Sequence, residues 1–343
     1  MSDPRRVHLV GSVPLADASD VFRTVAETLG DLIHRFPDGE TGARKEWVQW
    51  QKRILDEHPQ IELTEDKPLV FEQRDTRPYY RLKNGVKAGD LAFGPLGYAD
   101  CARSSYAEFR KLRSAGVIAG DARFLVAIPS PLAFLNVLVA ADHRAAIEGP
   151  YMERLLMEVD EIVAAIPHGD LAMQWDAVIE NLILEGVRTS NIDDSPEALV
   201  GRLARIGDRV PPAVELGYHL CYGDMNHRHS LEPPDMRVMT AVANRLSRML
   251  HRPLQYVHMP VPRNRGDEAY FAPLRDLALP GTEIFLGLVH HTDGVEGTRR
   301  RIDAATTSIA DFGIATECGF GRRSSETIVP LLEIHAACAR GGA

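Results

Sequence analysis

Cysteine is scarce in this chain, and it is scattered. The 343 residues include four cysteines, at positions 101, 221, 318 and 338, a density far below that of disulfide-stabilised secreted domains. Scattered cysteines in a chain of this length are typical of core residues, metal ligands or nucleophiles. We therefore expect a reducing compartment and a cytoplasmic protein.

Long hydrophobic runs are also lacking. The longest, residues 124–141, is interrupted by Pro129, Ser130, Pro131 and Asn136, so it predicts a strand, a loop and the start of a helix rather than a membrane span. The amino-terminal residues carry a basic pair, but their apolar stretch includes histidine, glycine and proline, and no small-residue cleavage site follows. This pattern argues against a signal peptide, and we expect no association with a membrane.

Positive charge is not in excess. The chain has 48 acidic and 39 basic residues and a net charge of −9, and an acidic surface repels nucleic acid, so the expected partner is a small molecule. The chain also lacks a GxGxxG that opens a helix after a strand, and it lacks GxxxxGK[ST], GxSxG and HExxH. The dinucleotide-binding, P-loop, serine-hydrolase and zincin classes thus lose their usual support.

Short apolar runs alternate with amphipathic helical stretches along the whole chain, without a linker between them. This alternation is typical of βα units in a parallel sheet. Eight such units predict a (β/α)₈ TIM barrel formed by a single domain that spans residues 1–343. The expected strands are residues 6–12, 32–37, 124–130, 171–177, 214–223, 254–261, 283–290 and 312–319.

One segment departs from this alternation. Residues 42–123, between the second and third expected strands, hold a tryptophan-rich helix at 45–55 and two strand-like runs at 69–73 and 79–85. We interpret the segment as an insertion, with a hairpin near residues 66–96 over the mouth of the barrel.

Reactive side chains stand where the expected strands end. Active sites of such barrels form at the carboxyl ends of the strands, which makes these residues the candidates for the site. They are Ser12, Glu40, Ser130, Asp176, His219, Cys221, His258, His290, His291, Glu317 and Cys318.

His219 and Cys221 give the sharpest signal. Residues i and i+2 of a strand point to the same face, so the two side chains can bind one ion. Further ligands would come from other strand ends, where His258 and Cys318 lie, and zinc prefers mixed nitrogen and thiolate ligands. The alternative is that Cys221 is a small core residue and His219 a hydrogen-bonded histidine.

Two motifs carry a resemblance to a known family. Residues 219–222 (His-Leu-Cys-Tyr) and 317–323 (Glu-Cys-Gly-Phe-Gly-Arg-Arg) resemble motifs of the catalytic carboxyl-terminal barrel of cobalamin-independent methionine synthase, in the wider group that includes uroporphyrinogen decarboxylase. In that family a histidine, two cysteines and a glutamate bind zinc, which holds a substrate thiol as thiolate for attack on a methyl group. Here His258 stands in place of the glutamate.

The resemblance implies further roles. Ser12, in a Gly-Ser-Val-Pro sequence, would bind the substrate, and Glu40 and Asp176 would hold its ammonium group. Ser130, selected by its strand-end position, is a further candidate substrate-binding residue. His290 or His291 would act as general acid, and Asp176 is also a candidate catalytic residue.

Three functions stay open at this point. The first is a zinc-dependent methyltransferase that moves a methyl group between a folate-type or methoxy or methylthio donor and a zinc-activated thiol, with tetrahydrofolate as a candidate co-substrate. The second is a zinc-dependent hydrolase or lyase in which Glu40 or Asp176 acts as base. The third is a non-catalytic barrel with a structural zinc. The sequence does not define the oligomeric state.

Overall fold

The computed structural model describes residues 4–64, 79–225 and 228–341. Its centre is a seven-stranded sheet in the order β1-β4-β5-β6-β9-β10-β11, and all neighbouring strands are parallel. The strands are β1 (Arg35–Pro37), β4 (Arg123–Pro129), β5 (Leu171–Ala177), β6 (Glu215–Leu220), β9 (Tyr256–Pro260), β10 (Glu283–Val289) and β11 (Gly313–Thr316).

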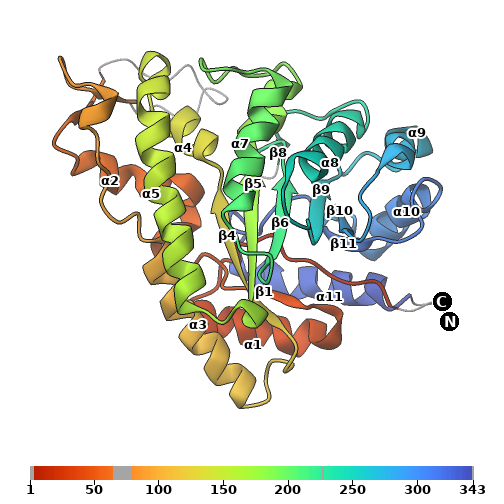
Figure 1. Ribbon diagram of the computed structural model, residues 1–343. Helices are drawn as coiled ribbons and strands as arrows, with labels where there is room; N and C mark the ends of the chain where they lie inside the picture. The colour runs from red at the N-terminus through yellow and green to blue at the C-terminus, as the bar shows by residue number, and fades with distance from the viewer. Residues whose placement is uncertain (1–3, 65–78, 226–227, 342–343) are drawn as a thin grey trace.

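Helices surround the strands, with α5 and α7 on the near side and α8 and α10 to the right in Figure 1. Within the described residues, none of these helices is both long and apolar enough to cross a bilayer. They are α1 (Ala18–Leu29), α2 (Lys52–Asp56), α3 (Tyr98–Ser114), α4 (Pro131–Leu138), α5 (Arg144–Ala165), α6 (Ile179–Leu184), α7 (Pro196–Asp208), α8 (Arg237–Met249), α9 (Glu268–Phe271), α10 (Gly294–Thr306) and α11 (Ile328–Ala339).

The sheet is curled, so that the first and last parts of the chain meet. Helix α1 packs against α11, and the Arg5 amide donates to the Ala339 carbonyl at 2.8 Å. The first expected strand, residues 6–12, makes only isolated parallel bridges, in which Val7 pairs with both Ile33 and Ile314. The prediction of an α/β fold with a parallel sheet is confirmed, and seven of the eight expected strands are regular.

The segment 42–123 contains a small antiparallel sheet of β2 (Ile61–Leu63) and β3 (Tyr80–Leu82). The second arm of the expected hairpin, residues 79–85, thus contains a strand, but its partner is Ile61–Leu63. The first expected arm, residues 69–73, lies outside the described residues. The tryptophan-rich stretch forms a 3₁₀ helix, η2 (Gly42–Gln51), that continues into α2.

The inner face of the curled sheet holds its own small apolar cluster. Leu125, Ala172, Tyr256 and Phe285, from four different strands, pack together there and are fully buried. Successive residues of a strand point to opposite faces, so every second residue after a member of this cluster faces the same interior. After Ala172 on β5 these residues are Gln174 and Asp176, and after Tyr256 on β9 the next is His258.

A buried carboxylate joins the 42–123 segment to the helices. Glu158 of α5 accepts the backbone amides of Leu96 and Ala99, at 2.7 Å each, and the guanidinium of Arg154. It thereby caps the amino terminus of α3, whose first amides have no partner within that helix.

We expect Glu158→Ala to destabilise the protein by about 3–5 kcal/mol, because it leaves the Leu96 and Ala99 amides without their acceptor and removes the buried ion-pair partner of Arg154. Urea unfolding measures the loss. Glu161 also contacts Arg154 from the same helix but is 40% exposed, so Glu161→Ala should cost less than about 1 kcal/mol. Equal losses in the two variants would contradict the assignment of Glu158 as the cap.

Candidate metal centre and substrate cavity

A partly open cavity lies at the carboxyl ends of the strands. It brings together Ser12, Glu40, Asp176, His219, Cys221 and Cys318, six of the residues that the sequence analysis selects. The full lining is Val10, Gly11, Ser12, Glu40, Lys45, Trp47, Asp176, Val178, His219, Cys221, Gly223, Cys318, Gly319, Gly321 and Arg322.

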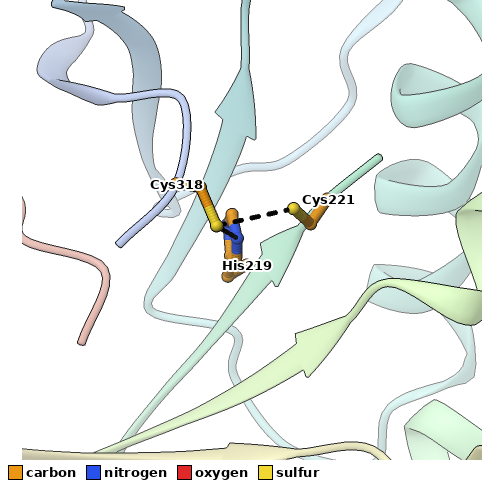
Figure 2. A group of neighbouring side chains, drawn as sticks. All are labelled: His219, Cys221 and Cys318. Atoms are coloured by element: carbon orange, nitrogen blue, oxygen red, sulfur yellow. Dashed lines mark hydrogen bonds between the residues drawn. The ribbon is translucent and has the colours of Figure 1, made fainter. Parts of the chain in front are cut away.

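Three of these side chains form a metal-ligand group. One donor atom each of His219, Cys221 and Cys318 lies within 4.8 Å of the others, and Figure 2 shows the three side chains converging. Cys318 Sγ is 3.8 Å from Cys221 Sγ and 3.7 Å from His219 Nε2. Tetrahedral zinc with zinc–sulfur bonds of ~2.3 Å separates two sulfurs by roughly 3.8 Å, so the donor set and its spacing fit this ion.

Local structure fixes the three donors. His219 lies near the end of β6, and the Cys221 amide continues the strand by donating to the Ala177 carbonyl at 3.1 Å. On the other side, the Thr316 hydroxyl donates to the Cys318 carbonyl at 2.6 Å and holds the turn after β11. The strand period thus positions two candidate ligands, and a hydrogen-bonded turn positions the third.

The structure places His258 behind His219 rather than among the ligands. Its Nδ1 lies 2.6 Å from His219 Nδ1, and its Nε2 lies 2.9 Å from the Thr316 carbonyl oxygen. Both ring nitrogens are therefore engaged. This arrangement differs from the expectation that His258 is a fourth zinc ligand. Burial in the sheet interior lowers the pKa of His258 to about 3, so the ring is neutral.

Glu40 lies across the cavity in a strained turn. Its backbone has φ 48°, a left-handed conformation that costs free energy for a residue with a side chain. The Asp38 carboxylate accepts the Glu40 amide at 3.0 Å and pairs with Arg44, which fixes this turn. Gly11 leaves room for the Glu40 carboxylate, because a Cβ at that position would lie 2.5 Å from its Oε1.

Asp176 is the second carboxylate of the cavity. Gln174 donates to its Oδ1 at 3.0 Å. Burial raises the pKa of Asp176 to about 7, against the effect of hydrogen bonds from Gln174 and Trp47. Burial and the nearby Asp176 raise the pKa of Glu40 to about 8, while Arg44 opposes the shift. Around neutral pH the two groups together therefore retain protons that free carboxylates would lose.

Ser12 holds the loop after β11. Its Oγ accepts the Gly321 amide at 3.1 Å, and its carbonyl accepts the Phe320 amide at 2.7 Å. Gly319 packs so closely on Ser12 that a Cβ there would lie 2.3 Å from the Ser12 Oγ. This loop carries Cys318, so Ser12 contributes to the position of a candidate ligand.

Besides His258, three other predicted catalytic or substrate-binding residues do not line the cavity. Ser130 is buried, and its amide donates to the Asp176 carbonyl. His290 is also buried, with Nε2 2.9 Å from the Val261 carbonyl oxygen and Nδ1 3.3 Å from a Glu317 carboxylate oxygen. His291 is partly exposed and is likewise not among the lining residues.

Comparison with known proteins adds evidence on the fold. No family model and no curated protein matches the sequence. A B12-independent methionine synthase from Shewanella sp. W3-18-1, solved in complex with selenomethionine, matches with a TM-score of 0.62 and 16% identity over 98% of this chain and 97% of that one. The chain has the fold of the cobalamin-independent methionine synthase-like proteins.

Two further structures agree with this result. A putative B12-independent methionine synthase from Listeria monocytogenes gives a TM-score of 0.56 at 12% identity over 98% of each chain. A methyltransferase from Methanosarcina mazei gives 0.52 at 10% identity over 99% of this chain and 94% of that chain. At these identities the likeness shows the fold, and it supports the resemblance inferred from the sequence motifs.

On this methionine synthase-like fold, the structure adds cavity residues that sequence reasoning missed. Lys45 and Trp47 come from η2 in the 42–123 segment, and Arg322 follows Cys318. Trp47 has φ 50°, so the backbone is strained at a second cavity residue. The tryptophan-rich composition of the segment was the available signal, but neither helical nor strand periodicity indicates which side chain would face the cavity.

The raised pKa of Glu40 predicts a pH-dependent cost in stability. The Glu40 carboxyl loses its proton near pH 4.5 in the unfolded chain and near pH 8 in the folded protein. The folded state therefore loses stability as the pH rises from 4.5 to 8. We expect Glu40→Gln to raise the free energy of unfolding at pH 8–9 on the order of 2–4 kcal/mol, with the gain vanishing near pH 4. Urea unfolding across pH measures it.

The exposed Glu27 on α1 provides the matched control, and Glu27→Gln should leave the pH profile of the wild type unchanged. A Glu40→Gln variant that is less stable than the wild type at pH 9 would show that the carboxylate is favourably paired in the free protein.

Proposed function

We propose that the protein is a zinc-dependent methyltransferase that transfers a methyl group from a small methylated donor to a thiol. The observation that carries the proposal is the His219, Cys221 and Cys318 group, spaced for a tetrahedral ion, in the wall of the cavity that also contains Glu40 and Asp176. Zinc bound there would lower the pKa of a coordinated thiol and supply a thiolate nucleophile.

The cavity suggests a zwitterionic aminothiol as acceptor. An ammonium group between Glu40 and Asp176 would favour the ionised form of both carboxylates, and the side chain would extend toward the cysteines. The Shewanella methionine synthase was solved with selenomethionine, an amino acid with a methylated selenium. A folate-type or methylthio donor is the proposed partner, with tetrahydrofolate as leaving group in the first case.

Transfer requires that the carbon–sulfur bond forms as the bond from the methyl group to the donor breaks, and that the leaving group takes up a proton. A thiol that binds zinc as thiolate would release one proton, which balances the proton that the leaving group takes up. Glu40 and Asp176 hold protons near neutral pH in the ligand-free protein, but an ammonium group between them would ionise both. His290 and His291, which do not line the cavity, therefore stay the predicted general acids.

The geometry also bears on the two other candidate functions. Structural zinc sites have four protein ligands, whereas catalytic sites keep one position open. Among the described residues the group comprises three ligands and faces a cavity, which favours a catalytic site. A hydrolase would use the same carboxylates as base. Binding of an aminothiol would distinguish the methyltransferase hypothesis from the hydrolase hypothesis.

The proposal includes the overall architecture. The bridges of Val7 to Ile33 and to Ile314 support a closed (β/α)₈ barrel in which residues 6–12 lie between β1 and β11. We also retain a single domain over residues 1–343, with 42–123 as an insertion, and a cytoplasmic location.

We expect the purified protein to bind about one zinc per chain, and Cys221→Ser and Cys318→Ser each to abolish tight binding, because each substitution leaves only two of the three candidate ligands. Elemental analysis after dialysis measures the metal. Cys101 lies in α3 outside the group, so Cys101→Ser should retain full occupancy. Full occupancy in Cys318→Ser would refute the site.

We expect Glu40→Gln and Asp176→Asn to weaken the binding of homocysteine at least tenfold while zinc content is unchanged, because a buried ammonium that loses one partner typically costs ~2–5 kcal/mol. Calorimetry on the zinc-loaded protein measures the affinity. Glu46 neighbours the cavity residues Lys45 and Trp47 but is exposed and outside the lining, and Glu46→Gln is the control. If the wild type binds no aminothiol, an uncharged methylated substrate replaces the zwitterion in the proposal.

A further inference from the structure

His219 and His258 are paired across two neighbouring strands. They are Cα partners in the parallel register of β6 and β9, so their side chains lie at the same height on the inner face of the sheet. The ring centroids are 4.7 Å apart, and the two Nδ1 atoms are 2.6 Å apart. The other nitrogen of His219, Nε2, faces Cys318 Sγ at 3.7 Å.

The hydrogen-bond chain has only one consistent direction. The Thr316 carbonyl oxygen can only accept, so His258 Nε2, at 2.9 Å, must carry a proton and donate it. In a neutral imidazole the other nitrogen, Nδ1, is then an acceptor. It can meet His219 Nδ1 at 2.6 Å only if that nitrogen is the donor. His219 Nε2 is left without a proton and with its lone pair toward the cysteines.

We propose that His258 is a positioning residue that fixes His219 in the Nδ1–H tautomer, the form that can bind a metal through Nε2. Histidines that bind metals usually donate their other ring N–H to a carboxylate, a carbonyl or water. Here a second imidazole takes that place, and the Thr316 carbonyl sets its tautomer in turn. This inference rests on the proposed function, because it takes His219 as a metal ligand.

The same chain of hydrogen bonds connects the three strands β6, β9 and β11. Thr316 accepts from His258 through its carbonyl and donates to the Cys318 carbonyl through its hydroxyl. One residue at the end of β11 thus sets the tautomer of His219 through His258 and the position of Cys318. A neutral acceptor behind His219 also adds no negative charge to the site, whereas a carboxylate in that place would.

Two substitutions of His258 separate the two functions of its ring. The side-chain oxygen of Asn can lie close to where Nδ1 is and keep an acceptor for His219 Nδ1, while the amide nitrogen of Gln can lie close to Nε2 and keep the bond to Thr316. We expect His258→Gln to weaken zinc binding about 10–100-fold and His258→Asn to remain within about threefold of the wild type. Competition with a chromophoric chelator measures the affinity.

A second measurement follows the tautomer directly in the metal-free protein. Long-range proton–nitrogen NMR spectra of the histidine-labelled protein should show Nδ1 protonated and Nε2 unprotonated for His219 in the wild type and in His258→Asn. His258→Gln should show a mixture of tautomers or the Nε2–H form. His8, whose ring lies 5.9 Å from that of His258 and bonds to Gln174, is the control, and His8→Gln should leave the zinc affinity within about threefold.

The outcomes distinguish this inference from the proposed function. If the wild type binds no zinc, the proposed function fails. If the wild type binds zinc and His258→Gln binds it equally well with the Nδ1–H tautomer intact, only the role of His258 is refuted. If His258→Asn and His258→Gln lose affinity equally while both keep the thermal stability of the wild type, selective support through Nδ1 is refuted.

Discussion

The parallel register of three neighbouring strands is the constraint on which the site depends. Asp176 of β5 is the Cα partner of His219 of β6, which is in turn the partner of His258 of β9. A shift of one residue in either pairing would turn a side chain of this row to the opposite face of the sheet. The packing below the row resists such a shift, because a Cβ on Gly217 would lie 2.1 Å from the Tyr256 ring.

Much of the site follows from this register and from the period of two along a strand. His219 and Cys221 are predictable as a pair from sequence, and the strand-end rule adds Asp176 and Cys318. The same period explains the residues that do not line the cavity. Asp176 is opposite Pro129, so Ser130 is out of phase with it. On β10 the register with β11 shifts between Leu286 and Val289, so the period of two does not predict the direction of His290, which follows that shift.

Other features could not follow from these rules. The strand-end rule predicts where His258 lies along β9, but it does not predict which residues its Nδ1 and Nε2 contact. Those contacts depend on the rotation of the ring and on the position of the Thr316 carbonyl. The expected first strand was assigned from its apolar residues, yet these residues form bridges without a regular ladder. Trp47 reaches the cavity from a 3₁₀ segment with an irregular backbone, and no sequence period describes such a segment.

In the proposed function the two sides of the cavity would be complementary in charge. Zn²⁺ bound by two thiolates and a neutral imidazole would have no net charge, and a third thiolate from a ligand would make the site singly negative. Opposite it, the Glu40 and Asp176 carboxylates have pKa values of about 8 and 7, so the empty cavity keeps part of their charge neutralised by protons. In the proposed function an entering ammonium group would replace those protons as the counter-charge. A cationic ligand would thereby relieve the destabilisation that the strained turn at Glu40 and the two cavity acids cause in the free protein, as expected where a fold gives up stability for a binding site.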